Sequence, residues 1–173
     1  MLTLLLGGAR SGKSTLAVQM AERQQLPVVF VATAEAFDDD MAERIRRHRE
    51  ERPAHWTTVE APVSLAEAID GAPTDAFVVV DCLTVWMANL MVHGADRAAA
   101  TERLLAALIR RAGPTVVVSN EVGMGIVPEH PMGREYRDDL GRLNQQVAAL
   151  AHTALLLVAG RATRLDDPWT LLT

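Results

Sequence analysis

The stretch Gly7-Gly8-Ala9-Arg10-Ser11-Gly12-Lys13-Ser14 fits the pattern G-x-x-x-x-G-K-[ST] of a phosphate-binding loop. It follows the apolar run Leu2–Leu6 and opens a helical pattern at 13–24, which is the strand-to-helix setting that the pattern requires. Glycines permit a tight turn that points backbone N–H groups at phosphate oxygens, and the helix N-terminus adds partial positive charge. The chain is therefore predicted to bind a nucleoside triphosphate. The alternative, a glycine-rich turn that binds nothing, does not account for the lysine and the hydroxyl.

Two side chains of this loop and one carboxylate elsewhere are predicted to act on the phosphates. Lys13 would reach the β- and γ-phosphates, and the Ser14 hydroxyl would ligate Mg²⁺. Asp81 follows the apolar run 77–80, so it is expected at the carboxyl end of a strand, where ligands bind in open α/β sheets. Asp81 could hold Mg²⁺ through water or orient an attacking hydroxyl. An acid after a strand is often only a helix N-cap, but the phosphate loop favours the functional role.

Short apolar runs alternate with helical patterns along the chain. The runs are continuous, which is typical of parallel strands covered on both faces. The predicted strands are 2–6, 28–32, 77–81, 115–119 and 154–159, with a short one at 57–60, and the predicted helices are 13–24, 38–51, 64–70, 83–92, 96–111 and 134–152. Ser64 and Glu67 resemble a capping box, and Gly113-Pro114 would end the helix before the strand at 115–119. This alternation predicts right-handed crossovers and a doubly wound α/β sheet.

Length, charge and cysteine content narrow the class further. A chain of 173 residues is expected to form one domain, 1–173. A net charge of -5 argues against a non-specific nucleic-acid binder, which needs a basic face. The single cysteine, Cys82, permits no internal disulfide, which favours a cytoplasmic location. The apolar run at the start is too short for a signal peptide or a membrane span.

The basic segment 40–52, DMAERIRRHREER, is predicted to be a helix with one inward face. Met41, Ile45, His48 and Arg52 recur at helical spacing, which places His48 on that face. Nearby guanidinium groups would keep its ring neutral and able to attack phosphorus, and would neutralise charge on the phosphate. On spacing alone, however, a histidine on an ordinary salt-bridged helix explains the pattern better than a nucleophile does. The remaining histidines have weaker claims, and no spacing suggests a metal site.

The arginines of this segment differ in whether an acid lies one helical turn away. Arg46 and Arg47 each have a glutamate four residues away. Arg49 and Arg52 have no acid three or four residues away within the segment. Arg49 and Arg52 are therefore predicted to be the two that meet a phosphate.

Three segments together carry a resemblance to a known family. They are GGARSGKS at 7–14, RIRRHREERPAHWTTVE at 44–60 and SNEVGMGIVPEHPMGREYRDDLGRLNQQVA at 119–148. The first is shared by many P-loop proteins. The other two are similar to the bifunctional adenosylcobinamide kinase / adenosylcobinamide-phosphate guanylyltransferase of cobalamin biosynthesis. The resemblance covers residues 2 to about 164. It implies a RecA-like P-loop fold and a homotrimer, and it gives the tail 166–173 no role.

The resemblance also implies two reactions. Members phosphorylate the aminopropanol hydroxyl of adenosylcobinamide and then transfer GMP from GTP to the new phosphate, which gives adenosylcobinamide-GDP and pyrophosphate. Mg²⁺ is the implied cofactor, and ATP and GTP are the implied substrates. The guanylylated histidine of the family falls on His48, and some members carry glutamate at the position of Asp81. The implied nucleotide contacts are Gly7, Gly8, Ala9, Arg10, Ser11, Gly12, Lys13, Ser14, Thr33, Ala34, Glu35, Arg49, Glu50, Glu51, Arg52, Glu60 and Asp81.

A long loop at 121–133 carries three glycines and two prolines, and a loop of this length in a compact domain is usually functional. We expect it to shape the side of the site that receives the corrinoid. The alternative is a subunit contact made through Met124, Ile126 and Val127. Two other functions stay open: an ordinary small P-loop kinase that has no reactive histidine, and a nucleotide-binding regulatory module without turnover.

Overall fold

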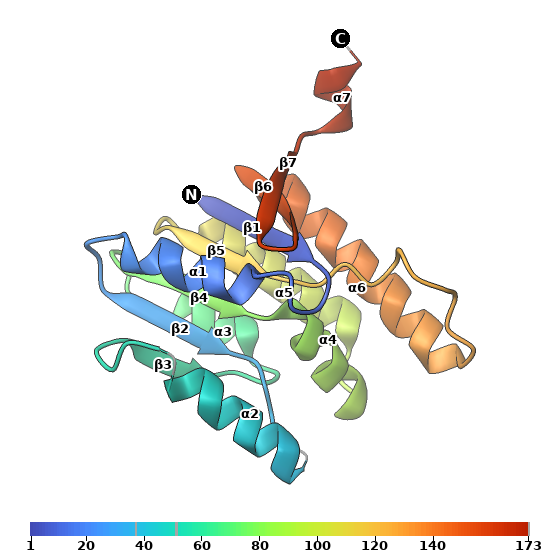
Figure 1. Ribbon diagram of the computed structural model, residues 1–173, viewed down its shortest axis with the longest axis horizontal. Helices are drawn as coiled ribbons and strands as arrows, with labels where there is room; N and C mark the ends of the chain where they lie inside the picture. The colour runs from blue at the N-terminus through green and yellow to red at the C-terminus, as the bar shows by residue number, and fades with distance from the viewer. Residues whose placement is uncertain (37, 51, 173) are drawn as a thin grey trace.

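The computed structural model describes residues 1–36, 38–50 and 52–172, and its strands form one seven-stranded sheet (Figure 1). The strands are β1 (Leu2–Gly7), β2 (Val28–Ala32), β3 (Thr57–Glu60), β4 (Phe77–Asp81), β5 (Thr115–Val118), β6 (Thr153–Val158) and β7 (Arg161–Leu165). Their order across the sheet is β3-β2-β4-β5-β1-β6-β7. Strands β1 to β6 are parallel, and β7 runs antiparallel to β6. The predicted mostly parallel α/β sheet is confirmed.

Helices cover both faces of the sheet, but unequally. They are α1 (Lys13–Glu22), α2 (Asp39–Glu50), α3 (Leu65–Asp70), α4 (Leu83–Val92), α5 (Arg97–Arg110), α6 (Pro131–Leu150) and α7 (Pro168–Leu171). Helix α1 packs on one face, helices α3 to α6 pack on the other, and α2 lies beside the edge strand β3 (Figure 1). The carboxyl ends of the parallel strands therefore lie at the edge of the sheet that α1, α2 and the loops after the strands surround.

The core has one part on each face of the sheet because successive strand residues point to opposite faces. Leu4 packs in the cluster under α3 to α6, whereas Leu5 packs in the cluster under α1, and both are fully buried. Ala17 and Ala21 bring α1 close to the strands. Burial of the sheet on both faces explains why the strand sequences are continuous apolar runs.

Most bounds of the predicted elements lie within two residues of the observed ones, and the larger differences are as follows. Ser64 stands at the cap of α3, but its side chain makes no capping hydrogen bond, so the predicted capping box is wrong. Helix α6 begins at Pro131 rather than 134, with proline in its first turn, where the missing N–H costs little. Strand β7 and helix α7 were not predicted, because 161–165 has no apolar run.

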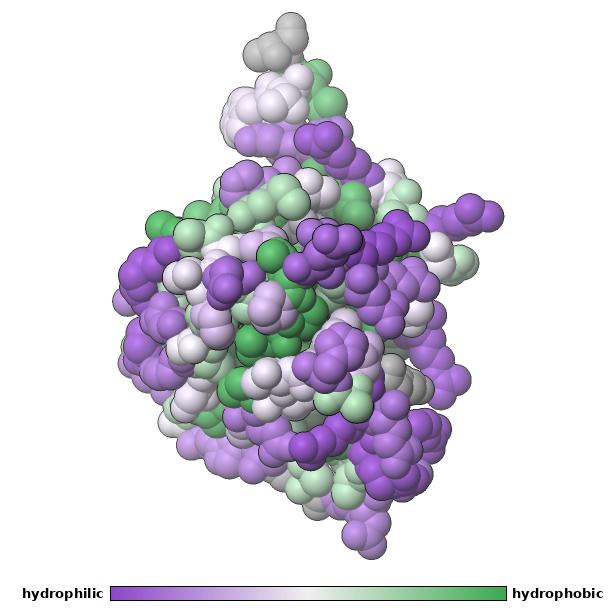
Figure 2. Space-filling view, turned by 90° about the vertical axis from the view of Figure 1, so that its left-hand side faces the viewer, coloured by the Kyte–Doolittle hydropathy of each residue, from purple (hydrophilic) through white to green (hydrophobic). Residues whose placement is uncertain are grey.

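The end of the chain forms an arm that stands away from the body. Strand β7 is exposed along its length, and α7 projects beyond it (Figure 1, Figure 2). Figure 2 also shows apolar side chains at the bottom of a hollow in the body, ringed by hydrophilic ones. No helix within the described ranges is both long and apolar enough to cross a membrane.

Candidate nucleotide site

The phosphate loop connects β1 to α1 and is held tightly by its neighbours. A Cβ at Gly7, where φ is +150°, would collide with the carbonyl oxygen of Leu157 on β6. Gly12 has φ +98° and lies against Gly160, whose N–H donates to the Ser11 carbonyl oxygen at 3.0 Å. Glycine is therefore required at both ends of the turn, and the β6–β7 hairpin supports the loop from one side.

Lys13 begins α1 and folds back over the loop. Its side chain is buried, and Nζ donates to the Gly8 carbonyl oxygen at 2.7 Å and to Ser11 Oγ at 3.3 Å. Burial lowers the pKa of Lys13, and electrostatic interactions with Cys82 and Asp81 oppose that shift. The ammonium group is thus positioned within the curve of the loop, where phosphate oxygens are expected.

Asp81 ends β4 beside the phosphate loop. Burial raises the pKa of Asp81, while hydrogen bonding with Ser14 and electrostatic interactions with His48, Arg52 and Lys13 oppose the rise. Hydroxyl and carboxylate oxygens are the ligands that Mg²⁺ takes, and two protein ligands suit an ion that keeps waters and phosphates in its shell. The predicted pair Ser14 and Asp81 therefore fits a magnesium site.

A cavity of about 380 Å³ adjoins this pair. Its walls come from helix α1, strands β2 and β4, helix α2 and the chain after α2, and they consist of Ser14, Thr15, Val18, Gln19, Glu22, Phe30, His48, Arg52 and Asp81. His48 faces this cavity but remains exposed to solvent, so its predicted inward position is correct in direction and not in burial. The structure therefore brings the candidate nucleophile to the same cavity as Ser14 and Asp81.

Arg46 and Arg47 on α2 each have the predicted glutamate four residues away, and Arg46 also has an unpredicted partner three residues away. Arg46 pairs with Glu43 at 2.6 Å and with Glu50 at 2.5 Å. Arg47 lies 3.9 Å from Glu43, and the other glutamate four residues from Arg47 in the sequence, Glu51, lies outside the described residues. These side chains are exposed. They form a solvated face of the helix.

Arg49 and Arg52 differ from each other, which the sequence did not predict. Arg49 lies 3.5 Å from Glu60, an acid on β3, so the absence of an acid on its own helix did not leave Arg49 unpaired. The Arg52 guanidinium lies over the ring of Phe30 and lines the cavity. Of the two, it is Arg52 that the structure places beside His48.

The predicted contacts after β2 divide into a buried residue and two accessible ones. Thr33 is fully buried, and its Oγ1 donates to the Cys82 carbonyl oxygen and accepts from the Cys82 N–H, each at 2.8 Å. The carbonyl oxygen of Thr33 accepts a hydrogen bond from Asn89 Nδ2 at 2.7 Å. The hydroxyl and carbonyl groups of Thr33 are therefore both hydrogen-bonded within the protein, and the hydroxyl links the end of β2 to the end of β4. Ala34 and Glu35 are half-buried, and Glu35 pairs with His93 at 2.7 Å. Sequence reasoning missed Asn89 and His93, which no motif marks.

The loop 121–133 begins on the phosphate loop. The Glu121 N–H donates to the Gly7 carbonyl oxygen at 3.2 Å. Arg134 holds the far end through Nη1, which donates to the carbonyl oxygens of Pro128 at 2.9 Å and Glu129 at 2.6 Å. Between these anchors, the loop exposes three large apolar side chains: Met124, Ile126 and Val127.

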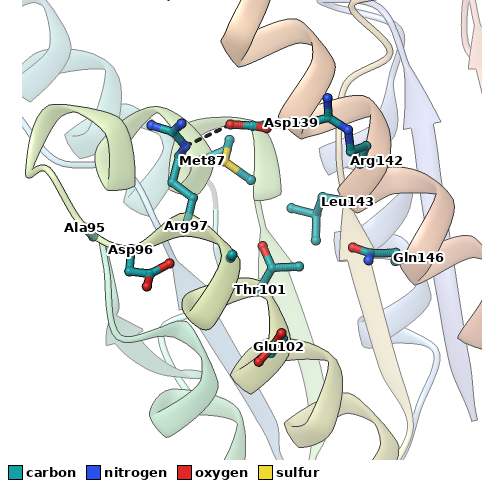
Figure 3. Close-up of a pocket in the computed structure, with 11 residues that line it drawn as sticks. Met87, Ala95, Asp96, Arg97, Thr101, Glu102, Asp139, Arg142, Leu143 and Gln146 are labelled. Atoms are coloured by element: carbon teal, nitrogen blue, oxygen red, sulfur yellow. Dashed lines mark hydrogen bonds and ion pairs between the residues drawn. The ribbon is translucent and has the colours of Figure 1, made fainter.

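A second cavity, of about 520 Å³, lies between α4, α5 and α6 (Figure 3). An ion pair between Arg97 Nε and Asp139 Oδ2, 2.8 Å apart, crosses it. None of the predicted site residues lines this cavity, so it is separate from the nucleotide site.

The phosphate loop after β1, with a carboxylate beside it at the end of β4, defines a P-loop protein with a RecA-like fold. The RadB recombinase has this fold, with a TM-score of 0.52 and 17% identity over 90% of this chain and 73% of that chain. The type III secretion ATPase EscN of enteropathogenic E. coli has a TM-score of 0.56 and 13% identity. The match to EscN covers 91% of this chain but only 43% of that chain. At these identities the likeness shows the fold alone.

Sequence comparison then identifies the family. Residues 3–165 match the family described as cobinamide kinase / cobinamide phosphate guanyltransferase. The bifunctional adenosylcobalamin biosynthesis protein CobP of Pseudomonas aeruginosa is 42% identical over 160 residues, which is 91% of this chain and 92% of the relative. CobU of Escherichia coli K12, another bifunctional adenosylcobalamin biosynthesis protein, is 41% identical over 177 residues, which is 92% of this chain and 97% of the relative. The chain belongs to the cobinamide kinase / cobinamide phosphate guanyltransferase family.

Proposed function

We propose that this enzyme phosphorylates adenosylcobinamide and then transfers GMP from GTP to the product through a covalent adduct on His48. The observation that carries the proposal is the shared cavity, because His48 from α2 and Arg52 from the chain after α2 line it together with Ser14 and Asp81. An ordinary kinase needs the second pair but not a histidine. The phosphate groups of both substrates would then be handled at one edge of the sheet.

In the kinase step, the acceptor hydroxyl attacks the γ-phosphorus of ATP or GTP, and the nucleoside diphosphate leaves. Lys13 holds the β- and γ-phosphates, and Asp81 orients the hydroxyl. Because burial raises the pKa of Asp81, its carboxylate can also accept the proton that the hydroxyl loses. Mg²⁺ held by Ser14 and, through water, by Asp81 would shield the phosphate charge.

In the guanylyl step, a ring nitrogen of His48 attacks the α-phosphorus of GTP. The bond between that phosphorus and the bridging oxygen breaks, and pyrophosphate leaves. The phosphate oxygen of adenosylcobinamide phosphate then attacks the same phosphorus, displaces the imidazole and forms adenosylcobinamide-GDP. Arg52 neutralises charge on the α-phosphate in both displacements.

The test is whether label from α-labelled GTP stays on denatured protein and is discharged by adenosylcobinamide phosphate. Retained and dischargeable label supports the proposal. Kinase turnover without retained label would favour an ordinary P-loop kinase. Binding of GTP without either reaction would favour a regulatory module.

Arg52 should matter much more than Arg46, although both belong to the basic segment 40–52. Arg52 lines the cavity, whereas Arg46 is engaged by two glutamates on the exposed face. Arg52→Ala should raise the KM for GTP in guanylyl transfer roughly ten- to one-hundred-fold, the value of a charged hydrogen bond. Steady-state kinetics of both variants give the comparison, with Arg46→Ala as the matched control near the wild-type value. A larger effect at Arg46 would mean that α2 presents its other face to the nucleotide.

The exposed apolar side chains of the loop 121–133 are proposed to contact the corrinoid ring. The loop starts on Gly7, so it lies within reach of an acceptor whose hydroxyl must meet the phosphate loop. Ile126→Ser should raise the KM for adenosylcobinamide roughly tenfold without changing the KM for GTP. Ile109→Ser, which alters an exposed isoleucine on α5, is the control.

The same variants test the alternative role of this loop. The family resemblance implies a homotrimer, and a subunit contact at Ile126 would show itself as a smaller particle in analytical ultracentrifugation of Ile126→Ser. A loss of oligomeric state with an unchanged KM for adenosylcobinamide would assign the loop to the interface. We also propose a cytoplasmic location, where ATP and GTP are supplied.

A further inference from the structure

Arg52 rests on a buried pair of aromatic rings. Its guanidinium carbon lies 3.7 Å from the centroid of the Phe30 ring. That ring in turn stacks on Trp56, with centroids 6.5 Å apart and an interplanar angle of 22°. Both aromatic side chains are buried, Phe30 on β2 and Trp56 just before β3. The three side chains form a stack that runs from the cavity into the core.

The chain after α2 folds back so that the stack can form. The Arg52 N–H donates to the Arg49 carbonyl oxygen at 3.3 Å, and the Trp56 N–H donates to the Pro53 carbonyl oxygen at 3.1 Å. These two turns bring Arg52 and Trp56 to the same ring from one short segment. The aromatic stack therefore fixes the end of α2, the helix that carries His48, against the sheet.

Stacking on an aromatic ring restricts the conformations of a long, flexible arginine side chain. The face of an aromatic ring attracts a guanidinium group, and the N–H donors of that group lie along its edges, in the plane parallel to the ring. Here the ring of Phe30 forms part of the wall of the cavity that His48 and Asp81 also line. Leucine at position 30 would fill the core similarly, but it would offer no π-face.

We propose that Phe30 is a positioning residue for guanylyl transfer: its ring, backed by Trp56, holds Arg52 at the cavity where His48 and the α-phosphate meet. This inference rests on the proposed function of His48. It assigns a specific task to a residue that otherwise reads as ordinary strand core. Phe30 acts through Arg52 and not on the nucleotide directly.

The experiment compares Phe30→Leu with a matched control, Phe77→Leu. Phe77 is equally buried, at 3% exposure, in the same core cluster, and it lies at the end of β4 opposite Asp81. Both variants should lower thermal stability similarly. Only Phe30→Leu should raise the GTP concentration for half-maximal labelling of His48, by roughly two- to thirtyfold, the value of a cation–π contact. Phe30→Tyr, which keeps the ring face, should restore the wild-type value.

A double-mutant cycle shows whether the effect passes through Arg52. In the Arg52→Ala background, Phe30→Leu should cause no further change in the GTP requirement. An equal change in both backgrounds, or the same change in Phe77→Leu, would overturn the inference. If the wild-type protein takes up no α-label, the proposed function has failed instead. Equilibrium binding of GTP to the same variants then tests the stack by itself, and equal affinities would refute it.

Discussion

Lys13→Ala should abolish both phosphorylation of adenosylcobinamide and guanylyl transfer while the protein stays folded. Lys13 is the only lysine in the chain, and its Nζ lies within the phosphate loop, bonded to Gly8 and Ser11. No other ammonium side chain can replace it on the β- and γ-phosphates. Loss of a preorganised charge of this kind is worth on the order of 10²–10³ in rate. Kinetics of both half-reactions, with circular dichroism to confirm folding, measure the effect.

Lys13→Met separates the charge from the packing of this buried side chain. Methionine keeps an unbranched apolar chain in the same space and lacks the ammonium group, so it should be as inactive as the alanine variant. Because the chain has a single lysine, an amine-directed reagent also reports on this position, with the N-terminal amine as the only other target. Mg²⁺ and GTP should protect Lys13 from modification. Near-normal turnover by either folded variant would mean that the loop does not hold the reacting phosphates.

The sequence predicted the framework of the site because local patterns encode it. The glycines at 7 and 12, Lys13 and Ser14 form a contiguous motif, and the predicted strand at 77–81 placed Asp81 at the sheet edge where the structure has it. Buried parallel strands also leave a strong signal, so β2 and β4 have the predicted bounds. These features depend on neighbours in sequence, and single-sequence reasoning reaches them.

The rest of the site depends on contacts between distant segments. Nothing in the sequence pairs Arg49 with Glu60. The search for acids along one helix therefore missed the ion-pair partner of Arg49, which comes from β3. Phe30 lies in a uniformly apolar run, and nothing in that run indicates that an arginine stacks on its ring. Thr33 was predicted to contact the nucleotide, yet its hydroxyl and carbonyl oxygen are bonded within the protein. Tertiary pairing decides such roles, and periodicity does not report it.

Protein incubated with Mg²⁺ and α-labelled GTP should retain label through denaturation, lose it in acid and keep it in alkali. Neutral imidazole attacking the α-phosphorus leaves GMP joined to nitrogen, with pyrophosphate as the leaving group. Protonation turns the ring of a phosphoramidate into a good leaving group, so this P–N bond is labile in acid. A phosphoester on serine would behave in the opposite way. Label from γ-labelled GTP should not be retained, and adenosylcobinamide phosphate should discharge the GMP adduct.

Substitution of individual histidines then locates the adduct. His48→Asn should take up no α-label and should lose guanylyl transfer, but it should keep part of its kinase activity, because Lys13 and Asp81 carry that step. His55→Asn and His130→Asn change exposed histidines outside the cavity and should label as the wild type does. Equal loss of both activities in His48→Asn would assign the histidine to binding. Undiminished labelling of His48→Asn would place the adduct on another residue, and an active wild-type protein without label would leave direct transfer as the route.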